Sequence, residues 1–224
     1  MKLGVLFSGG KDSCLAWSIA TKEHEVVCLI TVASKNKDSY FFHTPNIELT
    51  VLQAEASGIP HIIHVTEGEK EKELLDLKRA IEEAMQKHKI EGIVTGAVLS
   101  VYQATRVQKI CYELNLWCFN PLWLMDQLEL LQELQTRKIN AIIGAVASEP
   151  FDAKWLGRNI DELFIKDISS ITHLANPAGE GGEFESFVID MPLFKKKIEI
   201  VKARTEYNNY VGKYIIEEAR LCEK

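Results

Sequence analysis

The N-terminal half of the chain alternates between short apolar runs and longer stretches with apolar residues at helical spacing. Residues 3–7 form a continuous apolar run that ends at Ser8-Gly9-Gly10, and apolar residues then recur at positions 15, 16, 19 and 20. A run of this length is typical of a buried parallel strand, and the recurrence after it is typical of a helix. The first predicted unit is therefore a strand, a glycine-rich turn and a helix.

The same cycle repeats along the first 120 residues. Further strands are predicted at residues 25–33, 61–65, 92–97 and 116–122, and further helices at residues 47–57, 69–88 and 100–114. Five such cycles with short connections predict a five-stranded parallel sheet with helices on both faces. We therefore expect an α/β fold in which residues 1–120 form a Rossmann-type nucleotide-binding lobe.

The regular alternation of predicted strands and helices ends near residue 120. A helix is predicted at residues 127–137 and a strand at 141–147, followed by irregular segments. Apolar and polar residues alternate in residues 184–190 and 197–207, which predicts a late pair of strands with a turn at Met191-Pro192 between them. These features predict a smaller mixed α/β lobe at residues 121–224, and because no linker separates the lobes we expect them to pack closely.

Composition and charge narrow the function classes. The 224 residues are 46% hydrophobic and 26% charged, which is typical of a soluble globular protein. A net charge of −6 argues against a stable nucleic-acid complex, and no apolar run is long enough to predict a membrane span. The five cysteines include no CxxC pair, which favours reduced thiols over a zinc or disulfide site. We therefore expect a cytoplasmic protein.

The turn after the first strand, Ser8-Gly9-Gly10-Lys11-Asp12-Ser13, predicts an anion site. A glycine-rich turn at a helix N-terminus offers several backbone N–H groups and the positive end of the helix dipole, and phosphate suits both. The hydroxyls of Ser8 and Ser13 and the charge of Lys11 add to this site. Asp12 would be unfavourable beside a polyphosphate unless it caps the helix or faces Mg²⁺. The alternative is a turn with a helix cap and no ligand.

The turn does not match the Walker A loop, which would need Gly at position 5 and Ser or Thr at position 12, where the chain has Val5 and Asp12. It resembles instead the SGGxDS PP-loop of the N-type ATP pyrophosphatases. This resemblance implies that residues 8–13 bind the pyrophosphate part of ATP, with Lys11, Asp12 and Ser13 as catalytic residues. It also implies that a substrate is adenylated by attack on the α-phosphate.

A second stretch, "GAVLSVYQATRVQKIC", begins at the carboxyl end of the fourth predicted strand. Open α/β sheets bind their ligands at this edge, so Gly96 is predicted to lie beside the nucleotide. Tyr102 and Arg106 are four residues apart on one side of the helix that follows, with Gln103 beside them. These three side chains either face the cleft as substrate-binding groups or contact solvent on the helix surface.

A third stretch, "NPAGEGGEFESFV", combines three glycines with Glu180, Glu183 and Glu185 just before a strand. Because glycine costs backbone entropy, this composition suggests that Gly181 and Gly182 allow a ligand to approach the backbone closely. The carboxylates would suit a cationic group or Mg²⁺. The alternative is an exposed acidic hairpin loop.

Three motifs together, SGGKDS, the SxYQxxRV pattern at residues 100–107 and EGGEFES at residues 180–186, resemble the diphthine ammonia ligase family, also called diphthamide synthetase. The resemblance spans nearly the whole chain and implies a HUP-like nucleotide-binding lobe. It also implies ATP-dependent amidation of diphthine, a trimethylated modified histidine of translation elongation factor 2. The products would be diphthamide, AMP and pyrophosphate, formed through an acyl adenylate.

The implied substrate carries a quaternary ammonium group. Glu180, Glu183 and Glu185 would be suitable neighbours for this cation, together with an aromatic ring from Phe184, Tyr102 or Trp155. The two lobes already account for all 224 residues and leave no room for a glutaminase domain. Free ammonium is therefore the expected nitrogen donor.

Other functions stay open on the sequence alone. A tRNA-modifying PP-loop enzyme would share the first lobe, but it would usually need a cysteine pair or a basic RNA-binding segment. A small-molecule amide ligase would carry the same motifs. A non-catalytic adenine-nucleotide sensor would use residues 121–224 to bind a partner, and a homo-oligomer is compatible with any of these functions.

Overall fold

A computed structural model describes residues 1–34, 46–67 and 72–224, and the first three residues of the helix predicted at 69–88 lie outside this part. The N-terminal sheet contains β1 (Lys2–Leu6), β2 (Glu25–Ser34), β3 (His61–Thr66), β4 (Gly92–Val94) and β5 (Trp117–Phe119). Its strands are parallel in the order β3-β2-β1-β4-β5, which confirms the predicted five-stranded parallel sheet. β4 is shorter than predicted because the chain leaves the sheet at Thr95 to line a cavity.

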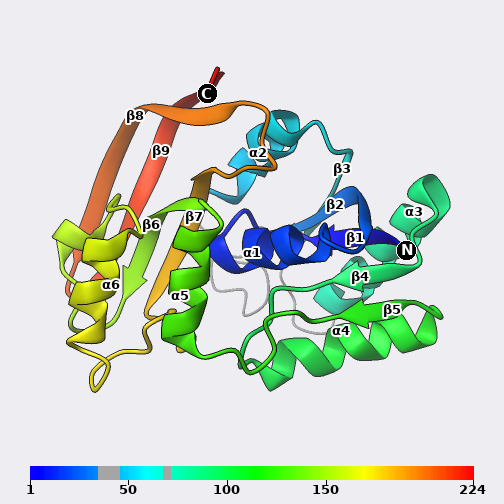
Figure 1. Cartoon of the computed structure of the whole chain (residues 1–224), viewed down its shortest axis with the longest axis horizontal. Coiled ribbons are helices and arrows are strands. Elements are labelled where there is room, and N and C mark those ends of the chain that lie inside the picture. Colours follow the sequence, from blue (N-terminus) through cyan, green and yellow to red (C-terminus); the bar gives the residue numbers. More distant parts are fainter. Residues whose placement is uncertain (35–45, 68–71) are drawn as a thin grey trace.

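Helices cover both faces of this sheet, as predicted (Figure 1). They are α1 (Lys11–Ala20), α2 (Thr50–Ser57), which follows the short 3₁₀ helix η1 (Ile47–Leu49), α3 (Lys72–His88) and α4 (Val101–Glu113). Leu3 and Val5 belong to a core that includes α1 and α2, whereas Ile30 and Ile93 belong to a second core with α3 and α4. Alternate strand residues therefore supply two separate hydrophobic layers.

The C-terminal lobe contains a four-stranded antiparallel sheet with two helices. Its elements are α5 (Gln127–Thr136), β6 (Asn140–Ala147), the 3₁₀ helix η2 (Ala153–Trp155), α6 (Glu162–Ser169), β7 (Phe184–Asp190), β8 (Lys197–Asn208) and β9 (Val211–Cys222). The strand order is β7-β6-β9-β8. The predicted smaller α/β lobe is thus confirmed, while the boundary at residue 120 stays a prediction.

The predicted pairing of residues 184–190 with 197–207 is wrong. β7 pairs with β6, and β8 pairs with β9, a strand that the sequence analysis missed. β8 and β9 are joined by Asn209 and Tyr210, both at positive φ (47° and 65°), which is the backbone of a tight hairpin turn. The turn at Met191-Pro192 instead leads the chain from one edge strand of the sheet to the other.

A helix also replaces part of the segment predicted to be irregular. α6 begins after Asp161, whose side chain accepts a hydrogen bond from the backbone N–H of Phe164 at 2.8 Å. This is a helix N-cap, and it fixes where the helix starts. Phe164 and Ile168 are fully buried, so packing against the sheet stabilises a helix of only two turns.

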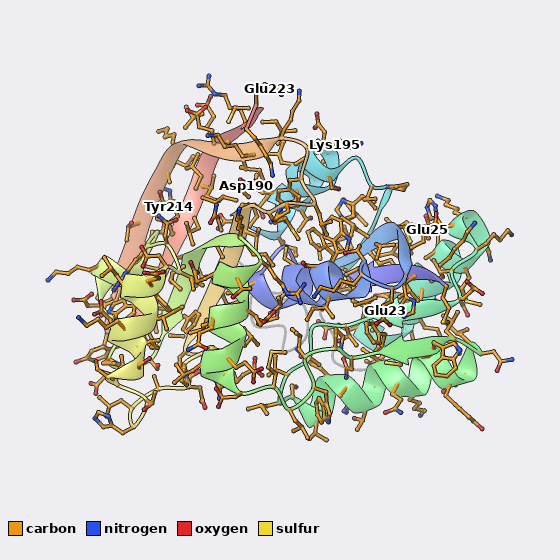
Figure 2. All side chains as sticks on the ribbon, in the orientation of Figure 1. Glu23, Glu25, Asp190, Lys195, Tyr214 and Glu223 are labelled. Carbon is orange, nitrogen blue, oxygen red and sulfur yellow. The ribbon has the colours of Figure 1, made fainter. Side chains whose placement is uncertain are left out.

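The two lobes share one hydrophobic core. Trp17 of α1 contacts Phe194, with 6.3 Å between the ring centroids, and the core around α1 includes Leu130 of α5 and Phe187 of β7. After β7 the chain passes α2, where the backbone N–H of Lys195 donates to Ala56 O at 2.6 Å (Figure 2). The lobes therefore pack closely, as expected.

The five cysteines are free thiols, as predicted, and Cys14, Cys28 and Cys111 are buried. Burial raises the pKa of Cys28 to about 12, so this thiol is unreactive at neutral pH. Within the residues that the structure describes, every helix is too short or too polar to cross a lipid bilayer.

Candidate active site

A cavity of about 770 Å³ lies at the carboxyl ends of β1, β2 and β4, and residues 179–185, the acidic loop, form part of its wall. β1 and β4 are neighbours in the sheet although they are far apart in sequence, and ligands bind at such switch points in open α/β sheets. Most of the predicted site residues line this cavity: Ser8, Lys11, Asp12, Ser13, Gly96, Gln103, Glu180, Gly181, Gly182 and Glu185. The structure thus brings together all three motifs.

Residues 8–13, the nucleotide loop, connect β1 to the N-terminus of α1. Gly9 has φ +76°, a conformation that favours glycine, and a Cβ there would lie 2.2 Å from Gln53 Oε1. Gly10, the N-cap of α1, has no side chain that could cap the helix, and Ser186 Oγ accepts the backbone N–H of Lys11 at 3.0 Å. The N–H groups of Asp12 and Ser13 also lie in the first turn of α1 and have no intrahelical partner, so an anion would be stabilised here.

Lys11 is held beside Asp12. Its Nζ donates to Asp12 Oδ2 at 2.9 Å and lies 5.4 Å from the centroid of the Phe184 ring. The Lys11 side chain is only 4% exposed, so the ion pair and the ring orient the charge at the cavity wall. The hydroxyls of Ser8 and Ser13 are 3.3 Å apart in the same loop.

The second carboxylate oxygen of Asp12 is a candidate metal ligand. Asp12 Oδ1 is buried and has no hydrogen-bond partner among the described residues. The same part of the chain contains no group of three or more His, Cys, Asp or Glu residues arranged to hold a metal. Asp12 therefore fits a Mg²⁺ ion that takes its other ligands from phosphate and water, as this ion commonly does.

Gly96 allows the end of β4 to approach α1. A Cβ at this position would lie 2.8 Å from both the carbonyl carbon of Asp12 and the backbone nitrogen of Ser13. Such distances are shorter than any side chain tolerates, so glycine is required for this packing. Gly96 thereby fixes the distance between the nucleotide loop and the residues after β4.

Glu183 stabilises the acidic loop from inside. Its carboxylate accepts hydrogen bonds from the backbone N–H of Asn176 (3.0 Å), from Asn176 Nδ2 (2.6 Å) and from the Gly181 N–H (2.7 Å). Burial alone would raise the pKa of Glu183, but these hydrogen bonds outweigh burial and hold the pKa below its usual range. Glu183 does not line the cavity, unlike Glu180 and Glu185, and its predicted contact with substrate stays a prediction.

Glu180 accepts a hydrogen bond from the Leu99 N–H at 3.1 Å. Burial is the main reason why the pKa of Glu180 is raised, and the negative charge of Asp12 adds to this effect, partly offset by Lys11. The Leu99 bond links the acidic loop to the segment after β4 across the cavity wall. One carboxylate oxygen of Glu180 therefore helps to hold the acidic loop in place.

Glu185 is the least constrained of the three carboxylates, because no hydrogen bond to it occurs within the described part of the chain. Glu185 is exposed where it lines the cavity, although protein atoms surround its carboxyl group. Burial raises the pKa of Glu185 to about 7, an effect that Lys11 partly offsets and that Asp12 and Glu180 increase. A cationic ligand in the cavity would stabilise its charged form.

The motif on α4 is only partly directed into the cavity. Gln103 lines it, whereas the Arg106 guanidinium stacks on the Tyr102 ring, 3.4 Å from its centroid. The predicted binding roles of Tyr102 and Arg106 therefore stay predictions. Trp155 packs against Phe151 and does not line the cavity. Of the three aromatic rings expected near the substrate cation, Phe184 lines the cavity, whereas Tyr102 and Trp155 do not.

Sequence reasoning missed three polar residues that support the site. Gln53 of α2 and Ser186 of β7 contact the nucleotide loop, and Asn176 binds Glu183. The signal for Gln53 was weak, because the buried face of α2 carries two further polar residues, Thr50 and Ser57. Ser186 stood inside the quoted EGGEFES motif without an assigned role.

Two family models match this chain. The "Diphthamide synthase N-terminal domain" matches residues 1–117, and the "Diphthamide synthase C-terminal domain" matches residues 126–222. Three similar proteins share the name diphthine–ammonia ligase. The Bos taurus protein is 35% identical over 88% of this chain and 82% of its own length, and the Homo sapiens protein is 34% identical over the same shares. The Schizosaccharomyces pombe protein is 34% identical over 100% of this chain and 40% of its own length. This chain therefore belongs to the diphthamide synthase family.

Proposed function

We propose that this protein catalyses the ATP-dependent amidation of diphthine on translation elongation factor 2, with ammonium as the nitrogen donor. The observation that carries the proposal is the single cavity in which the nucleotide loop faces the carboxylates of Glu180 and Glu185. The names of the similar proteins support diphthine and ammonia as the groups that are joined. Because the substrate is a translation factor, we expect the reaction to occur in the cytoplasm.

We propose one orientation for ATP in the cavity. Its phosphates would bind the hydroxyls and backbone N–H groups of residues 8–13, except the Lys11 N–H, which donates to Ser186 Oγ. The Lys11 side chain would exchange its contact with Asp12 for the departing pyrophosphate. The adenine would lie near Gly96, against the apolar side chains of Ile30 and Val32, which line the same cavity. Apolar walls with a few polar groups at one end are typical of nucleotide and other small-molecule sites.

Mg²⁺ would be held by Asp12, whose buried Oδ1 lacks a partner in the described chain. The ion would supply positive charge to the phosphate oxygens of ATP. The protein's own part is to hold Asp12 and Lys11 side by side, so that a carboxylate and a cation both face the same group of phosphates.

In the proposed first step, an oxygen of the diphthine carboxylate attacks the α-phosphorus and the bond to the bridging oxygen of pyrophosphate breaks. Glu180, Glu185 and the Phe184 ring would attract the trimethylammonium group and so orient this carboxylate. In the second step ammonia attacks the carbonyl carbon of the acyl adenylate. The carbon–oxygen bond to AMP breaks, and a proton leaves the new amide nitrogen.

Mass spectrometry of diphthine-bearing elongation factor 2 tests the proposal. After incubation with the protein, ATP, Mg²⁺ and ammonium, the modified histidine should lose the mass difference between OH and NH₂, and AMP should form in equal amount. Omitting ammonium should leave the histidine mass unchanged. ATP binding without AMP formation would favour a nucleotide sensor, whereas AMP formation with a different acceptor would favour another adenylating enzyme.

A further inference from the structure

The nucleotide loop is hydrogen-bonded to an edge strand of the other lobe. The backbone N–H of Val188 donates to Gly9 O at 2.9 Å, and the backbone N–H of Lys11 donates to Ser186 Oγ at 3.0 Å. Val188 and Ser186 both belong to β7, and Ser186 is only 5% exposed. Two points on β7 therefore fix two points on the loop.

Gln53, on α2, hydrogen-bonds to both the nucleotide loop and β7. Its Nε2 donates to Gly9 O at 2.9 Å and to Val188 O at 2.7 Å, and the residue is 0% exposed. Both partners are carbonyl oxygens, so the side chain must present an NH₂ group. Gln53 Oε1 is buried without a partner among the described residues, which indicates that the side chain is used for its two donors.

The same strand also carries groups that face the cavity. Phe184 and Glu185 line it and precede Ser186 directly, so a short stretch of β7 reaches from the proposed substrate groups to the nucleotide loop. A strand held in a sheet changes its length very little. The loop and the substrate groups are thus held at a fixed separation by consecutive residues.

We propose that Ser186 and Gln53 are positioning residues that hold the nucleotide loop at a fixed place relative to the substrate groups of β7. Neither residue lines the cavity, so both act through the backbone of Gly9 and Lys11. The inference rests on the proposed function for its kinetic readout. If this role is right, losing the Ser186 or the Gln53 contact lowers the rate of AMP formation more than it weakens ATP binding, because the phosphates are bound but misplaced.

An isosteric pair of variants at residue 186 tests this role. Ser186→Thr keeps the hydroxyl that accepts the Lys11 N–H. Ser186→Val has the shape of the threonine variant but lacks the hydroxyl. We expect AMP formation to fall about ten- to a hundred-fold in S186V and to stay within about three-fold of the parent in S186T. ATP affinity, measured by calorimetry, should change less than the rate. If S186V does not fold, Ser186→Ala takes its place against S186T.

Gln53→Glu provides a second measurement, because it keeps the shape of the side chain but places an acceptor against two carbonyl oxygens. It should lower AMP formation as S186V does. Ser57 offers a matched control: it is buried, and its Oγ accepts the backbone N–H of Ile59 at 3.2 Å at the far end of α2. Ser57→Val should reduce stability without a selective loss of AMP formation.

Equal rates in S186V and S186T would overturn the proposal, as would a loss in the Ser57 control as large as that in S186V. A parent protein that forms no AMP would count against the proposed function instead. The positioning role is then judged by amide hydrogen exchange. S186V must raise exchange at residues 9–11 relative to S186T, and equal exchange refutes the role.

Discussion

Gly96 and Asp12 meet backbone to backbone, with space for a hydrogen but none for a methyl group. Gly96→Ala would place a Cβ 2.8 Å from the Asp12 carbonyl carbon, so β4 or α1 must shift. We expect a loss of about 1–3 kcal/mol in the free energy of unfolding together with weaker ATP binding. Gly212→Ala is the control: its Cβ would lie 2.9 Å from Glu206 O, on a strand that β6 separates from β7, so it should reduce stability alone. Unchanged ATP affinity in G96A would show that the close approach is dispensable.

Lys11→Ala should reduce turnover more than ATP binding. Lys11 is oriented by Asp12 and the Phe184 ring, and its charge is expected to stabilise the pyrophosphate as it leaves. Removing one such preorganised group typically lowers kcat by about 10²–10³-fold. Steady-state kinetics and calorimetric ATP affinity measured on the same preparation separate the two effects. Equal losses in both would mean that Lys11 contributes ground-state binding only.

Glu183→Gln should destabilise the acidic loop. The carboxylate accepts from two donors of Asn176 and one of Gly181, and an amide would direct an NH₂ group at some of these donors. We expect a loss of about 1–3 kcal/mol in the free energy of unfolding, measured by urea denaturation. Full stability in E183Q would mean that these hydrogen bonds do not hold the loop.

The double change of Glu180 and Glu185 to Gln should weaken binding of the diphthine-bearing factor. Both carboxylates line the cavity, and loss of a partly desolvated cation contact is worth about 1–2 kcal/mol, or about five- to thirty-fold in affinity. ATP affinity should stay within a few fold because residues 8–13 are unchanged. The reverse pattern, with ATP or Mg²⁺ binding lost and substrate affinity kept, would assign the acidic loop to the nucleotide.

Stability of the ligand-free protein should fall as the pH rises through the range in which Glu185 ionises. The pKa of Glu185 is about 7 in the folded protein against 4.5 for an unperturbed glutamate, so between these values the folded state binds more protons than the unfolded state. The free energy of unfolding therefore decreases with rising pH in this window. Thermal unfolding across it should show the trend in the parent protein and a weaker trend in Glu185→Gln. Parallel curves would exclude Glu185 as the cause.

The first lobe could be predicted because β1, β2 and β4 are mostly buried apolar runs and its helices have clear periodicity. In the second lobe β9 was missed because only Gly212 and Ile216 of this strand are buried, which leaves no regular alternation of apolar and polar residues to separate it from a loop. Local motifs singled out the nucleotide loop and the acidic loop, and residues of both line one cavity in the structure. Gln53 and Ser186 could not be assigned, since their partners lie 44 and 175 residues away in the sequence and only the fold brings them together.

The contact between Trp17 and Phe194 has a consequence for how the chain can be divided. Trp17 is 2% exposed, and residues of the second lobe, Phe194 among them, belong to the core that buries it. An excised first lobe would present this indole and its apolar neighbours to water and should aggregate. The whole chain should instead melt in a single calorimetric transition, with equal van't Hoff and calorimetric enthalpies, because neither lobe keeps a complete interior alone.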